Sequence, residues 1–350
     1  MSYCLLSGEQ SGDQLAASLL TKLDAPCFGM GSTEMEKTGC EIIESPLHVM
    51  GFAAVAFALP KILAQMARLQ KAILKRNPKA VITIDNPDFS MFIAKRLRKK
   101  GYKGKLIHLV SPSVWAWRKN RIHTLANTID HLFTILPFEA SYYEKTSLPV
   151  TYIGHPLVHT VSLHKHSPLN LPEDVIALFP GSRSHEISDN LPLQLEAAKG
   201  HPIAISVARP ELEPLIRCHT NAPLIPADKR YDLMHQAKAA IATSGTIVLE
   251  LGLCHTPTIV TYKLSPFNYL LTRYLFRVHL PYYTLPNLVC EREIFPEFIH
   301  KTIDPREITC ALVRLIANPQ ICKNECARLM TLLNEGDSSE KAANIIMSMS

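Results

Sequence analysis

The chain of 350 residues predicts an α/β protein with two domains, each built around a parallel sheet. Short apolar runs alternate with longer helical patterns along most of the sequence, which favours βαβ units and therefore parallel strands. A chain of this length also fits two domains better than one hydrophobic core. Hydrophobic residues make up 47% of the sequence and charged residues 19%, which is typical of a packed globular protein.

The bulk composition argues against several classes of protein. The net charge of +6 is mild and scattered, so we expect no nucleic-acid partner, although a phosphorylated substrate or an anionic membrane surface fits. The nine cysteines form no Cys-x-x-Cys pair, and we expect reduced thiols in a cytosolic protein. The N-terminus lacks the basic and apolar regions of a signal peptide. The longest uncharged apolar run, Val49–Leu59, is too short to span a bilayer.

The first thirty residues predict a strand at Tyr3–Leu6, a turn at Ser7–Gly12 and a helix at Asp13–Leu23. Glycines in the turn let the backbone approach a ligand closely, and the polar side chains beside them can contact it. The candidate ligand-binding residues of this turn are Gly8, Glu9, Ser11, Gly12 and Asp13.

The next candidate is an aspartate at the end of an apolar run. Ala80–Ile84 is typical of a buried strand, and Asp85 follows it directly, before a turn at Asn86. Because ligands of open α/β sheets bind at the carboxyl ends of the strands, Asp85 is placed to act as a general base. A simple turn-forming role for Asp85 is the alternative. Asp88 is expected to cap the helix that follows.

Gly154–Pro172 has the composition of a domain linker, with three prolines and little periodicity. It also contains four histidines, among them His164 and His166. Since no carboxylate or cysteine lies near them in the sequence, we interpret them as solvated linker residues and expect no metal site. Residues 304–349 at the end of the chain predict two closing helices.

Two further turns predict a nucleotide site. Val175–Phe179 is typical of a buried strand and leads into a turn with Ser182 and Arg183, where free backbone N–H groups and a forked cation are expected. Ala239–Ala242 leads similarly into Ser244, Gly245 and Thr246 at the start of a helix, whose N-terminus suits a phosphate. Glu250 lies one turn further along, where it can reach sugar hydroxyls. Each turn alone is also compatible with an ordinary β-to-α connection.

Together these stretches resemble the lipid-A-disaccharide synthase family, in the family's order and as far as about Glu297. The motifs that carry the resemblance are SGEQSGDQLAASL (Ser7–Leu19), VMGFAAV (Val49–Val55), IDNPDF (Ile84–Phe89), VSPSVWAWRKNR (Val110–Arg121), LPFEASYYE (Leu136–Glu144), IGHPL (Ile153–Leu157), LFPGSRSHE (Leu178–Glu186), ATSGTIVLE (Ala242–Glu250) and YTLPNLVCERE (Tyr283–Glu293).

The resemblance implies the GT-B fold, in which two Rossmann-like domains face each other across a cleft. We expect an acceptor-binding domain over residues 1–160 and a UDP-sugar-binding domain with closing helices over residues 161–350. By the resemblance, Asp85 matches the essential acidic residue and Arg183 the essential arginine. Ser244–Thr246 with Glu250 matches the UDP-holding segment, and Asn287 lies in another shared motif, which makes it a candidate for substrate binding.

The activity implied is transfer of diacylglucosamine from UDP-2,3-diacylglucosamine to 2,3-diacylglucosamine 1-phosphate (lipid X), giving a β-1,6-linked disaccharide 1-phosphate and UDP. An α-linked donor and a β-linked product imply one inverting displacement. No Asp-x-Asp occurs in the chain, so we expect neither a catalytic metal nor another cofactor. The acylated substrates favour peripheral attachment to the cytoplasmic face of the inner membrane, through Val49–Leu59 or the aromatic run Pro266–Tyr283. A homodimer is expected from the family.

The sequence departs from the family pattern at Gln10 and Asn86, where alanine is common, and in a compressed region from Ser188 to Arg230. The alternatives are another UDP-sugar enzyme, such as a different glycosyltransferase or an epimerase, and a nucleotide-binding protein without catalysis. A nicotinamide dehydrogenase is weaker, because the Gly29 and Gly31 pair lacks the third glycine of a dinucleotide fingerprint.

Overall fold

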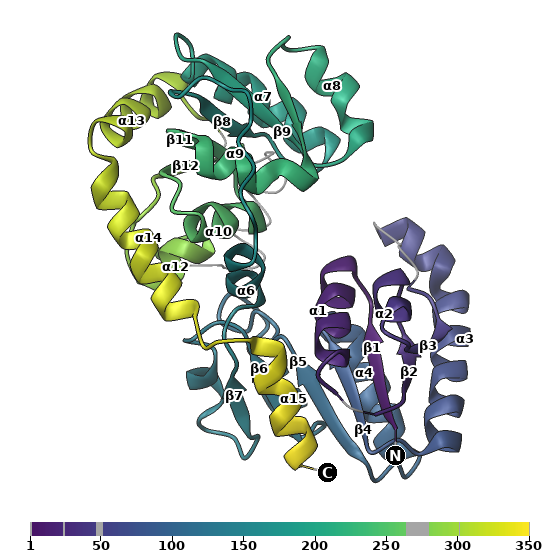
Figure 1. Cartoon of the computed structure of the whole chain (residues 1–350). Helices are drawn as coiled ribbons and strands as arrows, with labels where there is room; N and C mark the ends of the chain where they lie inside the picture. Colours follow the sequence, from purple (N-terminus) through teal and green to yellow (C-terminus); the bar gives the residue numbers. More distant parts are fainter. Residues whose placement is uncertain (1, 24, 47–51, 264–279, 301, 350) are drawn as a thin grey trace. The chain divides into compact units, whose positions relative to one another are not determined.

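The computed structural model describes the chain except residues 1, 24, 47–51, 264–279, 301 and 350, and it leaves the side chains of residues 10 and 52–58 undescribed. The chain forms two compact units (Figure 1). One consists of Met1–Pro156 with Glu335–Ser350, and the other of Leu157–Asn334. Each unit contains its own parallel sheet, which confirms the predicted α/β class with two parallel-sheet domains.

The N-terminal unit is built on a seven-stranded sheet of order β3-β2-β1-β4-β5-β6-β7. Its strands are β1 (Tyr3–Ser7), β2 (Cys27–Met30), β3 (Glu41–Glu44), β4 (Ala80–Ile84), β5 (Lys105–Leu109), β6 (His131–Thr134) and β7 (Val150–Tyr152). Its helices are α1 (Gln10–Leu20), α2 (Thr33–Lys37), α3 (Phe52–Arg76), α4 (Pro87–Lys99), α5 (Arg121–Ala126), the 3₁₀ turn η1 (Ala140–Tyr143) and α15 (Ser338–Ser348). The strand order reverses between β1 and β4, so their carboxyl ends form the switch point where such sheets bind ligands.

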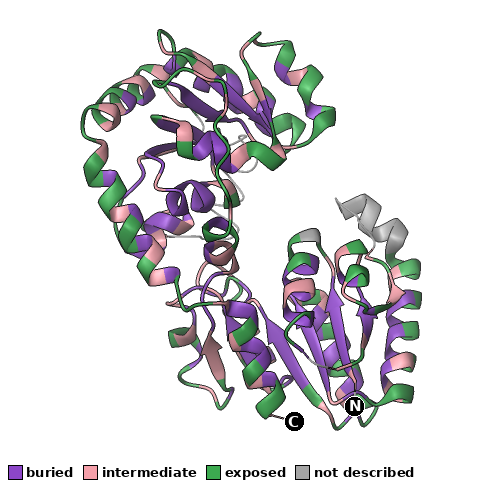
Figure 2. Cartoon of the chain, in the orientation of Figure 1, coloured by how far each residue is buried: buried purple, intermediate pink, exposed green. Residues whose placement is uncertain are grey.

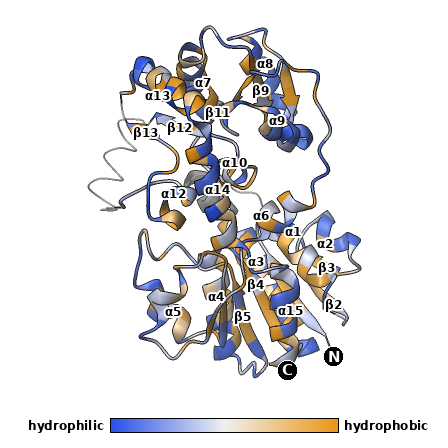
Figure 3. Ribbon diagram, turned by 60° about the vertical axis from the view of Figure 1, so that its left-hand side comes forward, coloured by the Kyte–Doolittle hydropathy of each residue, from blue (hydrophilic) through white to orange (hydrophobic). Residues whose placement is uncertain are grey.

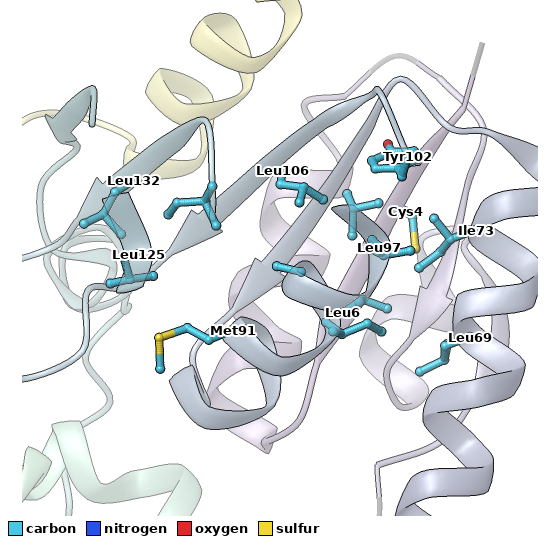
Figure 4. Packing of buried hydrophobic residues seen from close by; sticks show 14 of the residues in the cluster. Cys4, Leu6, Leu69, Ile73, Met91, Leu97, Tyr102, Leu106, Leu125 and Leu132 are labelled. Atoms are coloured by element: carbon cyan, nitrogen blue, oxygen red, sulfur yellow. The ribbon is translucent and has the colours of Figure 1, made fainter. Parts of the chain in front are cut away.

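Helices cover both faces of this sheet, so its central strands are buried along most of their length (Figure 2) and are predominantly hydrophobic, as β4 and β5 show (Figure 3). Successive side chains of β1 point to opposite faces of the sheet. Leu6 packs with Leu69 and Leu97 of the helices α3 and α4 (Figure 4), whereas Leu5 packs with Leu19 of α1 on the other side.

The last helix of the chain belongs to the N-terminal unit, which differs from the expected domain of residues 161–350. The apolar face of α15, with Ala342 and Ile346, joins the same cluster of buried residues as α1. Lys22 reinforces the contact through an ion pair of 3.1 Å with Asp337, the N-cap of α15. The prediction of two closing helices is also wrong, because residues 304–349 form three. Helix-initiating residues at Pro319 and Asp337 divide them.

The C-terminal unit is built on a six-stranded parallel sheet of order β10-β9-β8-β11-β12-β13, which reverses between β8 and β11. Its strands are β8 (Ile176–Phe179), β9 (Ile203–Val207), β10 (Leu224–Pro226), β11 (Ala239–Thr243), β12 (Thr258–Lys263) and β13 (Glu297–His300). Its helices are α6 (Pro156–Ser162), α7 (Ser184–Ala197), α8 (Glu213–Arg217), α9 (Arg230–Gln236), α10 (Thr246–Leu253), α12 (Leu285–Cys290), α13 (Pro305–Ala317) and α14 (Pro319–Leu333), with 3₁₀ turns η2 (Pro210–Leu212) and η3 (Ala227–Lys229).

Among the helices that the structure describes, none is both long enough and apolar enough to cross a bilayer. Most of the run Val49–Leu59 lies outside the described residues or has undescribed side chains, and residues 266–279 of the aromatic run lie outside them as well. The expectation that these two stretches contact lipid therefore stays a prediction.

The buried carboxyl of Glu139 leads to a prediction about how the free energy of unfolding depends on pH. Its side chain is only 2% exposed, and burial raises the pKa of its carboxyl to about 7, although a hydrogen bond from the N–H of Leu136 opposes the shift. Between pH 4.5 and 7 the folded unit therefore keeps a proton that the unfolded chain releases, so stability falls as the pH rises through this window. Relative to Glu139→Gln, which cannot titrate, the wild type should lose up to about 3 kcal/mol between these limits.

Urea unfolding followed by tryptophan fluorescence measures this difference. Both tryptophans, Trp115 and Trp117, lie in the N-terminal unit, so the signal reports on the unit that contains Glu139. Equal pH profiles for the wild type and Glu139→Gln would contradict the raised pKa.

Candidate active site

The C-terminal unit has a cavity of about 470 Å³ at the carboxyl edge of its sheet. The cavity opens between the ends of β8 and β11, where the strand order reverses. It is lined by Phe179, Gly181, Ser182, Arg183, Glu186, Ser206, Ala208, Ala227, Arg230, Thr243, Ser244, Gly245, Thr246, Ile247 and Glu250. The structure thus brings together the two turns that the sequence singled out, including all of Ser182, Arg183, Ser244, Gly245, Thr246 and Glu250.

The N-terminus of α10 forms one wall of this cavity. Gly245 is its N-cap, and the space where a Cβ would stand on Gly245 contains no atom within 4 Å. The N–H of Ser244 donates to Thr261 of β12, which fixes the turn to the sheet. The first N–H groups of a helix have no partners inside the helix, and the helix dipole adds positive potential there. This wall therefore offers a small open surface that suits an anion.

The opposite turn differs from the expectation of free N–H groups. The N–H groups of Ser182 and Arg183 both donate to Glu186 Oε2, at 2.9 and 3.2 Å. Glu186 is buried, and its Cβ would lie 2.6 Å from a Cβ on Gly181, whose φ is +122°. Glycine is thus needed at residue 181, and the carboxylate of Glu186 already occupies the place predicted for a ligand anion.

Arg183 keeps the role of a cation at the rim of the cavity. Its Nη1 lies 3.1 Å from Glu186 Oε1, and 55% of its side chain is exposed. An ion pair this exposed is weak, so the guanidinium can turn toward a bound anion at small cost. Arg209 donates to the carbonyl oxygen of Ser182 at 2.9 Å and holds the turn from the other side.

Glu250 is held by an arginine that the sequence reasoning missed. Arg230 Nε donates to Glu250 Oε2 at 2.6 Å, and its other nitrogens donate to Ala227 O and Tyr231 Oη. Burial alone would lower the pKa of Arg230, but the charge of Glu250 and its hydrogen bond outweigh this and raise it. Because Arg230 begins α9, far from Glu250 in the sequence, only the fold reveals the pair.

In the N-terminal unit, Asp85 follows β4 at the switch point and adopts an unusual backbone conformation. Asp85 and Asn86 have φ values of +54° and +43°, a left-handed region that costs most residues energy but suits asparagine. The N–H of Asn86 donates to Asp85 Oδ1 at 2.8 Å, and Ser90 Oγ donates to the carbonyl of Asp85. Asn86, where the family commonly has alanine, also caps α4. Asp88 is not the cap that we expected, because its carboxylate pairs with Arg121.

The first turn contributes less to a ligand site than the sequence suggested. Asp13 is 1% exposed, and its two oxygens accept hydrogen bonds from the N–H and hydroxyl of Ser32 at 2.7 and 2.6 Å. Gly12 is buried, and a Cβ there would lie 2.8 Å from Ser7 Oγ. Asp13 therefore ties α1 to the start of α2, and Gly12 lets α1 lie close to β1 and β4, while the contact of these two residues with a ligand stays a prediction. Glu9 and Ser11 are exposed near the carboxyl end of β1.

Gly8 lies against Asn86, and both border a second cavity of about 510 Å³. The walls of this cavity are mostly apolar side chains of α3 and α4. Its lining comprises Gly8, Met30, Pro46, Leu59, Ile62, Leu63, Gln65, Met66, Asn86, Asp88, Phe89 and Phe92. Exposed fractions of 42% for Leu63 and 41% for Phe92 show that this hydrophobic surface continues to the outside.

Asn287 is a structural residue, contrary to its predicted contact with substrate. Its side chain is fully buried. Its amide nitrogen donates to Phe295 O and Glu297 Oε1, and its amide oxygen accepts from the N–H groups of Ile294 and Phe295, all between 2.8 and 3.0 Å. These four bonds use the whole hydrogen-bonding capacity of the amide, which fixes the connection from α12 to β13.

Comparison with protein families supports one assignment. The family model described as lipid-A-disaccharide synthetase matches residues 3–348. A lipid-A-disaccharide synthase of Chlamydia muridarum is 41% identical over 97% of this chain, but the chain spans only 61% of that relative's length. A lipid-A-disaccharide synthase of Alcanivorax borkumensis is 33% identical and matches over 97% of this chain and 95% of its own.

Solved structures show the same architecture at low sequence identity. The glycotransferase of kitacinnamycin aligns with a TM-score of 0.69 and 12% identity over 99% of this chain and 98% of its own. The UDP-GlcNAc 2-epimerase of Neisseria meningitidis bound to UDP-GlcNAc aligns with a TM-score of 0.60 and 15% identity over 99% of both chains. The fold is thus that of GT-B glycosyltransferases, and the fold alone does not separate transfer from epimerisation.

The Arg230–Glu250 pair yields a prediction about stability. Arg230→Met should cost about 2 kcal/mol, because it leaves a carboxylate with 10% side-chain exposure without its partner. In a Glu250→Gln background the same substitution should cost less than about 1 kcal/mol, since no charge is then left unpaired. Chemical unfolding followed by far-UV circular dichroism measures both costs. Additive costs would show that the two side chains are not coupled.

Proposed function

The chain belongs to the lipid-A-disaccharide synthase family, and on that premise we propose that it transfers 2,3-diacylglucosamine from UDP-2,3-diacylglucosamine to the 6-hydroxyl of lipid X, releasing UDP. The observation that carries the proposal is the cavity at the β8/β11 switch point. It combines a helix N-terminus, an exposed cation at Arg183 and an oriented acid at Glu250, which are the groups that a nucleoside diphosphate needs.

The donor occupies this cavity with its diphosphate at the start of α10. The N–H groups around Gly245 and Thr246 bind phosphate oxygens, and Ser244 contributes its hydroxyl. Glu250 lies one turn further along α10 and accepts hydrogen bonds from the ribose hydroxyls. Arg230 occupies Oε2 of this carboxylate and so directs Oε1 toward the sugar.

Departure of UDP places negative charge on the β-phosphate, and Arg183 supplies the compensating cation. Since the N–H groups of Ser182 and Arg183 are bound to Glu186, the guanidinium acts in place of the backbone on this side. The chain contains no Asp-x-Asp motif, and we propose that Arg183 and the α10 N-terminus perform the charge stabilisation without a metal.

Asp85 is the proposed general base. It takes the proton from the acceptor 6-hydroxyl while that oxygen attacks the anomeric carbon, so that an α-linked donor gives a β-linked product. Its neighbours are less suitable, because Asp13 is committed to Ser32 and Asp88 to Arg121. Bonds from Asn86 and Ser90 hold Asp85 in its left-handed conformation, which orients the carboxylate before the acceptor binds.

The apolar cavity between α3 and α4 is the proposed site of a substrate acyl chain. It borders Asn86, next to Asp85, and its open side exposes Leu63 and Phe92. We propose that the same surface meets the cytoplasmic face of the inner membrane, with Lys71 and Lys75 of α3 near anionic head groups. We propose that Val49–Leu59 and Pro266–Tyr283 contribute to the same membrane contact. A homodimer is proposed separately, from the family alone.

Turnover by purified wild type and Asp85→Asn tests the function. Mass spectrometry with UDP-2,3-diacylglucosamine and lipid X should detect the disaccharide from the wild type. Asp85→Asn should lower kcat by about 10²–10⁴-fold, as loss of a general base does. Asp174→Asn is the matched control and should stay within about threefold of the wild type, because its carboxylate is exposed, is paired with Lys238 and lines neither cavity.

The alternatives give different products. Turnover of UDP-N-acetylglucosamine without an acylated acceptor would favour an epimerase or hydrolase, and UDP binding without any turnover would favour a binding protein. Disaccharide from Asp85→Asn at the wild-type rate would retain the function and exclude Asp85 as the base.

Exchange of Leu63 and Phe92 for glutamine tests the acyl site. The double variant should bind vesicles of anionic phospholipid at least tenfold more weakly and should raise KM for the acylated substrates, since it removes exposed apolar surface. UDP binding should not change, because the nucleotide cavity lies in the other unit. Ile321→Gln, at an exposed position of α14, is the control. Equal losses in the control would refute a specific acyl surface.

A further inference from the structure

Three metal-binding side chains that are far apart in the sequence meet in the C-terminal unit. His164 and His166 follow α6 in an extended segment, and Asp232 lies in α9. His164 Nε2 is 2.9 Å from Asp232 Oδ1, across a sequence separation of 68. One ligand atom from each of the three lies within 4.8 Å of the other two. The expectation of solvated linker histidines is therefore wrong for His164, because the fold supplies the buried carboxylate that the local sequence lacks, whereas His166 is exposed as expected.

Other bonds hold the segment and α9 together around the cluster. The N–H of Ser167 donates to Asp232 Oδ1 at 2.8 Å. Gln236, one turn along α9, donates to Leu169 O and Leu171 O and accepts from the N–H of Leu169. Five hydrogen bonds, counting the one from His164, thus fix the register of the extended segment on the helix. The ligand atoms are positioned by the fold and do not depend on an ion to meet.

A further histidine, His235, lies beside this group, although it is not among the three residues whose ligand atoms lie within 4.8 Å of one another. His235 follows Asp232 by three positions on α9, so the two share a helix face. Its ring lies 3.6 Å from that of His166, measured between centroids. Ligand atoms around a tetrahedral zinc ion are about 3.3 Å apart. The ligand atoms of His164, His166 and Asp232 lie at most 4.8 Å apart. Side-chain rotations that move these atoms by roughly an ångström therefore bring them to zinc-binding distances.

We propose that His164, His166, Asp232 and His235 form a zinc site that clamps the segment after α6 to helix α9. Three imidazoles and one carboxylate form a ligand set that suits Zn²⁺. The hydrogen bonds from His164 and Ser167 both end on Asp232 Oδ1, which leaves Oδ2 as a further ligand oxygen. Asp232 is buried, whereas His166 is exposed, which gives the ion a path from solvent.

The clamp stabilises the helix that orients the acid of the nucleotide cavity. The ring of His164 lies 5.2 Å from the ring of Tyr231. The guanidinium of Arg230 lies over the same Tyr231 ring, 4.2 Å from its centroid. Arg230 in turn holds Glu250. A helix of seven residues has little stability of its own, so a metal bond at Asp232 and His235 fixes its whole length.

Zinc titration of the full chain tests the site. After chelator treatment and dialysis, the wild type should bind one Zn²⁺ per chain at this site in isothermal calorimetry. The double variant His164→Ala with His166→Ala should weaken zinc binding by more than about tenfold. Losing only a residue that hydrogen-bonds to a metal ligand already costs about this much, and this variant removes two ligands. The matched control, His201→Ala with His219→Ala, changes two histidines of the same unit outside the cluster and should bind as the wild type does.

Cobalt distinguishes this site from the cysteines. Co²⁺ held by imidazole and carboxylate gives visible d–d bands without the near-ultraviolet charge-transfer band of a thiolate, and these bands should be absent from the double histidine variant. Asp232→Asn, which keeps an oxygen for the N–H of Ser167, should weaken binding in the same way. Circular dichroism confirms that each variant is folded.

Hydrogen exchange tests the clamp itself. Zinc should slow exchange in residues 163–171 and 230–236 of the wild type and leave both unchanged in the double variant. Zinc affinity that survives the histidine substitutions, a thiolate band with cobalt, or unchanged exchange on zinc addition would each overturn the proposal and reduce the cluster to an ion pair between His164 and Asp232.

Discussion

The requirement to cover both faces of a parallel sheet determines where this protein can bind ligands. In each unit, helices pack on the two faces and bury the central strands, so that near the middle of the sheet backbone and side chains become accessible at the strand ends. The order of each sheet reverses once, between β1 and β4 and between β8 and β11, and the connections diverge there. The candidate base and the nucleotide cavity lie at these two reversals. The position of the chemistry therefore follows from how the cores are buried.

Much of this arrangement can be predicted from the sequence, because it depends on local patterns. Apolar runs ending in glycine, serine or aspartate indicated the strands and turns around Asp85, Arg183 and Ser244, and the motifs indicated the family. The sequence could not show which polar groups are already paired. Asp13 and Asn287 have the residue types of a binding site, but Ser32 and the loop at Phe295 use their hydrogen-bonding groups. Pairs such as Arg230 with Glu250 depend on tertiary structure, and no local pattern reveals them.

The two turns of the nucleotide cavity illustrate how similar sequences acquire different roles. Both follow a buried strand and contain glycine and serine, yet one has Glu186 three residues after Arg183 and the other has apolar residues at the corresponding place. Glu186 closes a capping box and neutralises the start of α7. The start of α10 keeps its positive potential, because no acidic residue lies in its first turn. A single side chain thus decides which helix attracts an anion.

The position of α15 has a consequence for how the protein folds during synthesis. The N-terminal unit receives its last core residues, Ala342 and Ile346, from the end of the chain. Until the ribosome has translated these codons, one face of the first sheet keeps an apolar strip uncovered, while residues 157–334 can already fold behind it. The nascent polypeptide thus passes through a state in which its second module is complete and its first is not, and that strip is a natural target for a chaperone such as those that bind exposed hydrophobic segments on emerging chains.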